Sequence, residues 1–82
     1  MDEPTHWAFI ILPLALPLVY TYAIPHHLQE RALPGCRVEV VFGKNKKYAG
    51  IIKSLTTLQP GYATKPILNV LDDAPLLYAQ QM

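Results

Sequence analysis

The feature that most restricts the fold is a run of nineteen uncharged residues, 7–25, with Pro13 and Pro17 near its middle. A run of this length is sufficient to cross a bilayer as a helix. Two features count against a membrane or signal segment: each proline removes a helical hydrogen-bond donor, and the residues before the run are acidic where a signal peptide is basic. We therefore expect two buried strands, 8–12 and 19–24, joined by an apolar connection.

Proline and glycine also divide the rest of the chain, with eight prolines and four glycines among 82 residues. The pieces between them are too short for long helices, which favours strands. A chain of this length forms one small domain that buries roughly 60–65% of its unfolded surface. The single cysteine, Cys36, excludes an intramolecular disulfide framework and a cysteine-rich zinc site, so we expect a reducing, cytoplasmic setting.

The second half of the chain predicts a β-hairpin. Residues 36–42 alternate between apolar and charged side chains, as in a half-buried strand. Gly43 and Asn45, the two residue types most tolerant of positive φ, then supply a tight turn before a second strand at 47–55.

Three further segments complete the expected architecture: a short helix at 26–32, a long loop at 55–66 and a last strand at 65–72. The tail from residue 74 has no strong period. About five strands separated by turn signals predict a mainly β fold, with α+β as the alternative. We expect residues 1–82 to form a single domain, a small antiparallel sheet curled toward a partly open barrel with one short helical turn.

Positive charge is concentrated in the middle of the chain, although the net charge is only +1. Residues 37–65 hold one acidic residue and six basic ones, which are Arg37, Lys44, Lys46, Lys47, Lys53 and Lys65. A basic stripe beside a glycine is the electrostatic footprint of a nucleic-acid binder. Lysines at a hairpin tip or sheet edge also prevent strand-to-strand aggregation, so composition alone leaves both interpretations open.

Motifs for catalysis or metal binding are not found in the sequence. The glycines lack the spacing of a phosphate-binding loop, so we expect no nucleotide hydrolysis by this chain. His26 and His27 have no carboxylate or thiol at ligand spacing, which favours surface positions over a metal site. Cys36 is expected to be a small buried residue, and Asp72 and Asp73 to be turn residues.

The aromatic residues each have two interpretations. Tyr20 and Tyr22 share one face of a strand, where they can stack on bases or pack in the core, and we expect core packing for at least one. Trp7 and Phe9 form a similar pair and are expected in the core. Tyr48 follows the lysines, where it suits either stacking on nucleic acid or packing across the hairpin.

Three segments, ILPLALPLVYTYAIP, PGCRVEVVFGKNKKYAGIIKSL and KPILNVLDDAP, together resemble the N-terminal segment of primosomal protein N′, a bacterial DNA helicase that restarts stalled replication forks. The resemblance extends over about residues 8–75. It implies a domain that binds the 3′ end of a nascent strand at a fork, independently of base sequence. It also implies that winged-helix, helicase and zinc-binding domains, with their ATP, magnesium and zinc, lie in other parts of the parent protein.

For the terminal nucleotide, the resemblance implies a pocket formed by Tyr20, Thr21, Gly43 and Lys65. In this set Tyr20 supplies a stacking or wall surface, Gly43 exposes backbone groups, and Lys65 bonds to or neutralises the strand end. Well-known members of the family carry an aspartate where this chain has Thr21. A neutral hydrogen bond is therefore expected at that position in place of a charged one.

The lysines of the hairpin, Lys44, Lys46 and Lys47, are predicted to contact DNA phosphates beside the pocket. The implied partners are forked DNA with a 3′ strand end, the other helicase domains, single-strand DNA-binding protein and primosome components, in the bacterial cytoplasm at the nucleoid and without a membrane. No cofactor is expected in this chain. Two alternatives remain: a protein-interaction module that docks an acidic partner or another domain of the helicase, and a structural lid on the helicase core.

Overall fold

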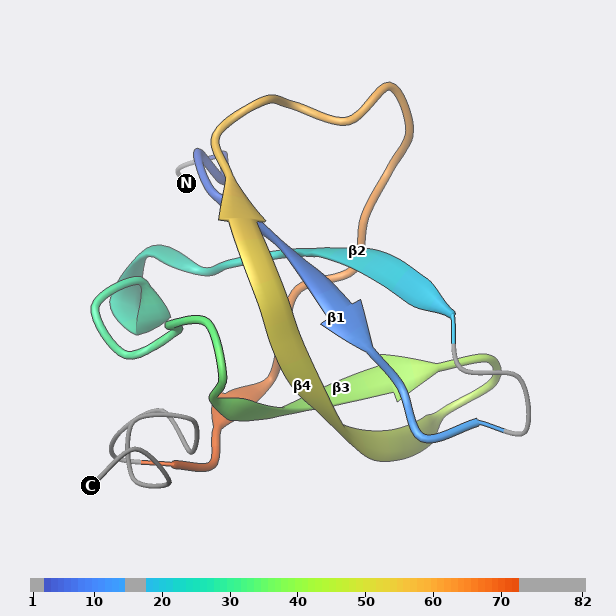
Figure 1. The fold of residues 1–82 in the computed structure, drawn as a ribbon. Helices are drawn as coiled ribbons and strands as arrows, with labels where there is room; N and C mark the ends of the chain where they lie inside the picture. The colour runs from blue at the N-terminus through green and yellow to red at the C-terminus, as the bar shows by residue number, and fades with distance from the viewer. Residues whose placement is uncertain (1–2, 15–17, 73–82) are drawn as a thin grey trace.

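The computed structural model describes residues 3–14 and 18–72, and within them the chain forms five strands. They are β1 (Trp7–Ile11), β2 (Val19–Ala23), β3 (Arg37–Phe42), β4 (Lys46–Thr56) and β5 (Asn69–Val70). All five lie in one antiparallel sheet in the order β2-β1-β4-β3-β5, so the predicted mainly β architecture is confirmed (Figure 1). No helix in the described residues is long and apolar enough to span a membrane.

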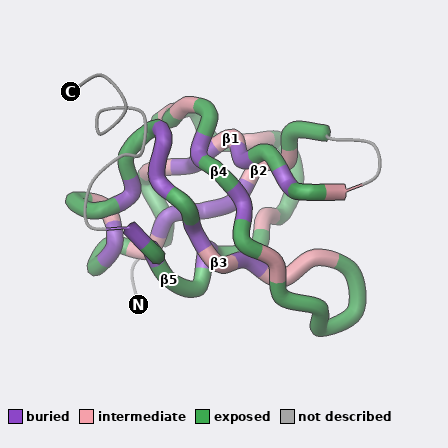
Figure 2. Tube along the Cα trace, turned by 60° about the horizontal axis from the view of Figure 1, so that its bottom comes forward, coloured by how far each residue is buried: buried purple, intermediate pink, exposed green. Residues whose placement is uncertain are grey.

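One face of the curled sheet carries the main hydrophobic core, which Figure 2 shows as purple stretches of several strands. The strand period of two determines its members: Ala8 and Ile10 of β1 are fully buried, as are Val38 and Val40 of β3. Cys36, directly before β3, is a buried free thiol, as expected. The other members of the cluster are Leu12, Tyr22, Ile24, Leu28, Ala32, Ile52, Ile67 and Val70.

Trp7 and Phe9 lie on the opposite face of β1, so the expectation that both belong to the core was wrong for Phe9. Trp7 is 5% exposed, whereas Phe9 is only half-buried. The loop that follows β4, residues 57–64, lies against this second face, and Trp7 shares a small cavity there with Tyr62. Alternation correctly groups Trp7 with Phe9, but it does not say which face of the strand the larger core covers.

The chain just before β5 pairs with the edge of β2. The N–H of Ala23 donates to the carbonyl of Lys65 at 2.9 Å, and the N–H of Ile67 donates to the carbonyl of Ala23 at 3.0 Å. This bridge, between Ala23 and Pro66, is parallel. Of the strand predicted at 65–72, only β5 is a strand paired with β3. The residues before it bond to the edge of β2 instead.

The same segment then pairs with β3. Leu68 and Leu71 donate their N–H groups to the carbonyls of Glu39 and Arg37, at 2.7 and 2.8 Å. In the sheet order β1 and β4 separate β2 from β3, so one short segment can contact both only if the sheet curls. The result, within the described residues, is a partly open barrel whose seam lies between β2 and the hairpin end of β3.

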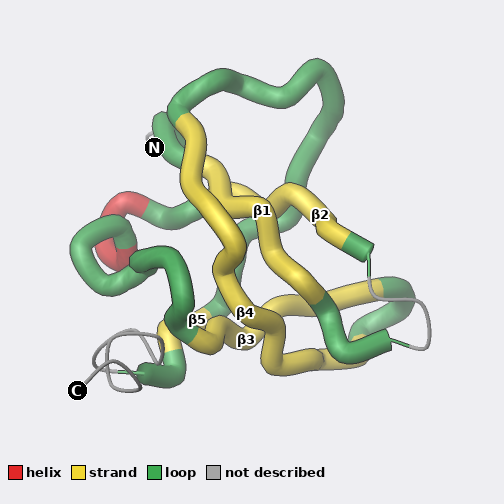
Figure 3. Tube along the Cα trace, in the orientation of Figure 1, coloured by secondary structure: helices red, strands yellow, loops and turns green. Residues whose placement is uncertain are grey.

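The helical turn and β4 also differ in extent from the sequence-based expectation, and β1, β2 and β3 differ by one residue at one or both ends (Figure 3). In place of the helix expected at 26–32, the structure has only the 3-10 helix η1 (His26–Leu28). It ends at Leu28, whose side chain packs in the core. β4 is longer than the expected 47–55 because its pairing with β3 begins at Lys46, directly after the turn. His26 and His27 are exposed, as expected. The expectations for residues 15–17 and 73–82 lie outside the described residues.

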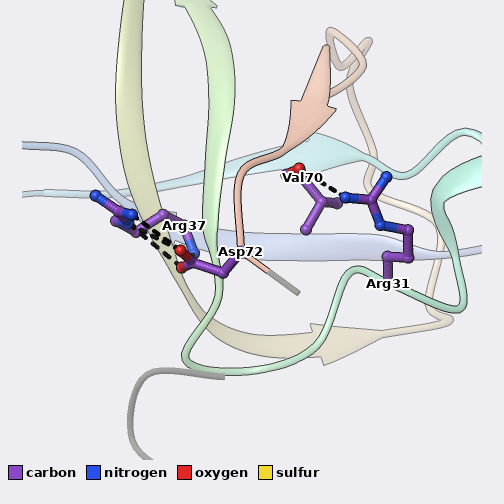
Figure 4. A network of polar contacts seen from close by, with 4 residues as sticks. All are labelled: Arg31, Arg37, Val70 and Asp72. Atoms are coloured by element: carbon purple, nitrogen blue, oxygen red, sulfur yellow. Dashed lines mark hydrogen bonds and ion pairs between the residues drawn. The ribbon is translucent and has the colours of Figure 1, made fainter. Parts of the chain in front are cut away.

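Asp72 was expected in a turn but instead forms an ion pair with Arg37 (Figure 4). Its carboxylate accepts the backbone N–H of Arg37 at 2.8 Å and the guanidinium Nη2 at 3.0 Å. The hydrogen bonds from the Arg37 side chain, and then the one from its backbone, hold the pKa of Asp72 below its ordinary value of 3.8. The side-chain hydrogen bond, and then the charge of Asp72, raise the pKa of Arg37. Arg31 adds a hydrogen bond to the carbonyl of Val70 at 3.1 Å, so both arginines fasten the chain around β5.

Gly50 lets β4 pass close to β1. A Cβ built on Gly50 would lie 2.5 Å from Cγ2 of Ile10, 2.9 Å from Cδ2 of Leu12 and 3.1 Å from the carbonyl oxygen of Ile11. Ile10 and Leu12 are fully buried and the carbonyl belongs to a paired strand, so none of these atoms can move aside cheaply. Gly61, in the exposed loop, has nothing within 4 Å of the same construction.

Gly50→Ala is therefore expected to lower the free energy of unfolding by about 1–3 kcal/mol through overpacking of the core. Urea denaturation followed by circular dichroism measures this change. Gly61→Ala is the matched control and is expected to alter stability by less than about 0.5 kcal/mol. Equal effects of the two substitutions would contradict the close approach of β4 to β1.

Asp72 should also make the stability depend on pH. The pKa of Asp72 is lower in the folded chain than in the unfolded chain. Its ion pair with Arg37 therefore adds its full share to the free energy of unfolding above the unfolded pKa, and this share is lost as pH falls through the folded pKa. The urea midpoint of the wild type should therefore fall between about pH 5 and pH 2, and Asp72→Asn should flatten that fall. Glu30→Gln, at an exposed position, should leave it unchanged. An unaltered pH profile in Asp72→Asn would show that the pair does not stabilise the fold.

Candidate nucleic-acid interface

Four residues implied by the resemblance, Tyr20, Thr21, Gly43 and Lys65, line one pocket of about 440 Å³. The pocket lies at the seam, where β2 faces the hairpin end of β3. Its other lining residues are Tyr22, Val41, Phe42, Tyr62, Ala63 and Thr64. The fold thus brings the predicted set together from one strand, a turn and a loop end, while its role in binding stays a prediction.

At the seam, β3 presents a row of backbone carbonyls. Those nearest β5 accept backbone N–H groups, as described above. Farther along, the carbonyl of Val41 accepts the hydroxyl of Tyr22 at 2.9 Å, and the carbonyl of Gly43 accepts the ammonium group of Lys65 at 3.2 Å. At the pocket, side-chain donors therefore satisfy the edge of the strand, and these donors can exchange for groups of a ligand more easily than a backbone ladder can.

Lys65 and Gly43 form the polar corner of the pocket. The ammonium group has three donors and uses one on the Gly43 carbonyl, which leaves two for a bound group. Gly43 has φ of 69°, a conformation that side chains rarely adopt, and nothing lies within 4 Å of a Cβ built there. Glycine is thus needed for its backbone conformation, and its peptide groups are open to a ligand.

Tyr20 and Phe42 line the apolar side of the pocket, and Tyr48 packs behind Phe42. Tyr20 packs edge-to-face against Phe42, with ring centroids 4.8 Å apart, and Phe42 packs against Tyr48 at 6.2 Å. Tyr48 therefore packs across the hairpin, one of the two expected roles. Tyr20 is only half-buried, so part of its ring remains available to a nucleotide.

Tyr22 is a structural residue of the pocket. Its side chain is 4% exposed and belongs to the main core, which confirms that at least one tyrosine of β2 packs there. Burial, and secondarily the neighbouring Tyr20, raises the pKa of Tyr22 above its ordinary value of 10.0. Its hydroxyl thus stays protonated at neutral pH and continues to donate to Val41 across the seam.

The hairpin lysines are exposed and lie beside the pocket, not among its lining residues. Lys44 follows Gly43 in the turn, where Asn45 also has a positive φ of 63°. Lys46 pairs with Phe42 and shares its face, whereas Lys47 pairs with Val41 on the other face. The two strand lysines therefore point to opposite sides of the hairpin, and their contacts with phosphates stay a prediction.

Tyr62 is a pocket residue that sequence reasoning missed. Its hydroxyl lies 3.2 Å from Oγ1 of Thr21, in a hydrogen bond between residues 41 apart in the sequence. The segment around Tyr62 was interpreted only as a long connection with a Pro-Gly turn, because no periodicity places a loop residue on a distant strand.

The ion pair of Arg37 with Asp72 removes one of the six basic residues from the predicted stripe. The remaining five are exposed: Lys44, Lys46, Lys47, Lys53 and Lys65. In the part of the chain that the structure describes, no group of three or more histidine, cysteine or acidic side chains is placed to hold a metal ion. Lysines, aromatic rings and backbone groups are thus the chemistry that the pocket and its surroundings offer.

A family model described as the 3′ DNA-binding domain (3′BD) of PriA matches residues 9–82. The matched region includes the whole pocket at the seam and the lysine hairpin. PriA is the primosomal protein N′ that the sequence resembles, and the match supports DNA binding in a replication-restart protein. The chain belongs to the family of PriA 3′ DNA-binding domains.

Proposed function

We propose that this domain captures the 3′ end of a DNA strand at a replication fork and holds the terminal nucleotide in the pocket at the seam. The observation that carries the proposal is that Tyr20, Thr21, Gly43 and Lys65 line one pocket in a chain of this family. A strand leading away from the pocket would pass the exposed lysines of the hairpin, which suit contacts with phosphates.

The lining explains how such a pocket would accept any base. Tyr20 offers part of a ring, and every base has a face that can pack against it. Gly43 offers backbone groups, and Lys65 offers two donors that the Gly43 carbonyl does not use. None of these groups demands a particular pattern on the base edge, so recognition is by the presence of a strand end.

Thr21 would contact the terminal sugar. Its hydroxyl already bonds Tyr62 and, having one donor and two acceptor positions, can still bond a ligand hydroxyl. Compared with the aspartate of well-known members, this neutral contact is weaker by about 1 kcal/mol. End recognition in this chain therefore depends more on the shape and backbone of the pocket.

In the parent helicase, the captured end would orient the motor on the fork. ATP and magnesium would act in the helicase lobes and zinc in its own insertion, with single-strand DNA-binding protein and primosome components as further partners. This part of the proposal comes from the family resemblance.

A terminal 3′ hydroxyl should bind more tightly than a terminal 3′ phosphate, by about fivefold. A 3′ phosphate is bulkier and more strongly hydrated than a hydroxyl, and losing that hydration in a pocket with an aromatic wall is expected to cost more than the attraction of Lys65 returns. Fluorescence anisotropy with two short DNAs that differ only at the 3′ end measures the difference. Equal affinities would mean that the lysines hold DNA only by its charge and that the pocket does not read the end.

Lys65→Ala should weaken binding of the 3′-hydroxyl DNA by about tenfold, because a charged donor in the pocket is lost. Lys53→Ala is the matched control: it removes the same charge from an exposed position outside the pocket, so its effect should be small. The same anisotropy assay compares them. Equal losses would favour general electrostatic attraction, and full binding by Lys65→Ala would favour the protein-interaction alternative.

A further inference from the structure

Tyr62 is an exposed aromatic residue that is nevertheless held in place. Its side chain is 65% exposed, yet its hydroxyl bonds Thr21 of β2 at 3.2 Å. This bond ties the loop of residues 57–64 to the strand that forms one wall of the pocket at the seam. An exposed ring with few rotatable bonds and a fixed end is well suited to stacking, because little side-chain entropy is lost on binding.

A second, smaller pocket of about 220 Å³ adjoins the first. Both are lined by Thr21 and Tyr62, so these two residues form the boundary between them. The remaining lining residues of the second pocket are Phe9, Thr56, Leu58, Gln59 and Pro60. The lining is largely apolar, with hydroxyl and amide groups and no charged side chain, which suits a base and not a phosphate.

We propose that Tyr62 is a further DNA-contact residue and that it divides two neighbouring nucleotide subsites. The terminal nucleotide occupies the pocket at the seam, and the base next to it stacks on the ring of Tyr62 and enters the second pocket. The proposal rests on the proposed function, because it requires a strand end beside Thr21. It commits to DNA as the occupant since the second pocket continues the first across a shared pair of residues.

A thermodynamic cycle on the 82-residue chain tests this. Anisotropy is measured for wild type and Tyr62→Ala with a short 3′-hydroxyl DNA and with the same DNA made abasic at the penultimate position. Tyr62→Ala should weaken binding of the intact DNA about fivefold or more and leave binding of the abasic DNA almost unchanged. An abasic site far from the 3′ end is the control and should preserve the effect of the substitution.

Tyr62→Phe separates the ring from the hydroxyl. It keeps the stacking surface and loses the bond to Thr21, so it should retain the dependence on the penultimate base. If Tyr62→Phe behaves like Tyr62→Ala, Tyr62 acts only through Thr21 and the stacking role is overturned. Thermal unfolding of both variants should match wild type because the ring is exposed.

Additive effects of Tyr62→Ala and the abasic site would overturn the second subsite. If Lys65→Ala still weakens binding in that case, end capture stands and only the role of Tyr62 fails. The second pocket, where Leu58 is 80% exposed, would then suit a protein partner instead of a base. If neither Lys65→Ala nor the chemistry of the 3′ end alters affinity, the proposed function itself fails.

Discussion

The hydrogen bonding of residues 65–72 to both sides of the seam is the constraint on which the rest of the structure depends. A five-stranded sheet in the order β2-β1-β4-β3-β5 would otherwise leave β2 and the far end of β3 as open edges. The segment bonds Ala23 of β2 with its first residues and β3 with its last. The Arg37–Asp72 pair then fastens its end, so a short piece of chain keeps the sheet curled.

The candidate site follows from the same constraint. Lys65 can reach the Gly43 carbonyl only because the neighbouring backbone is bonded to Ala23 at the edge of β2. Backbone groups satisfy the β3 edge near β5, and side chains satisfy it at the pocket. The backbone ladder of β3 thus continues into a stretch where side chains are the donors, so the candidate site lies beside a hydrogen-bonded scaffold.

The domain carries little charge for a DNA-binding protein. Its net charge is +1, and one arginine of the basic stripe is paired with Asp72. In the proposed function, electrostatic attraction by the five exposed lysines would supply modest affinity that is independent of base sequence. If the domain captures a strand end as we propose, discrimination of that end would come from the shape of the pocket, from the Gly43 backbone and from the rings of Tyr20 and Tyr62.

Much of the fold could be predicted from the residue pattern. Two prolines divided the long apolar run into β1 and β2, and alternation with a Gly-Asn turn indicated the hairpin of β3 and β4. These features are local: φ preferences and the period of two act within a few residues. The set of pocket residues came from the family resemblance, and the structure places them in one pocket.

Tertiary structure decided what depends on contacts between distant residues. Alternation grouped Trp7 with Phe9, but only the packing of the sheet showed that the main core covers the other face of β1. The bond of Tyr62 to Thr21 and the pair of Arg37 with Asp72 join residues 41 and 35 apart. The sequence by itself determined which side chains share a strand face. Which of them meet across the seam was decided by the curl of the sheet, because no local preference specifies partners that only the curled sheet brings together.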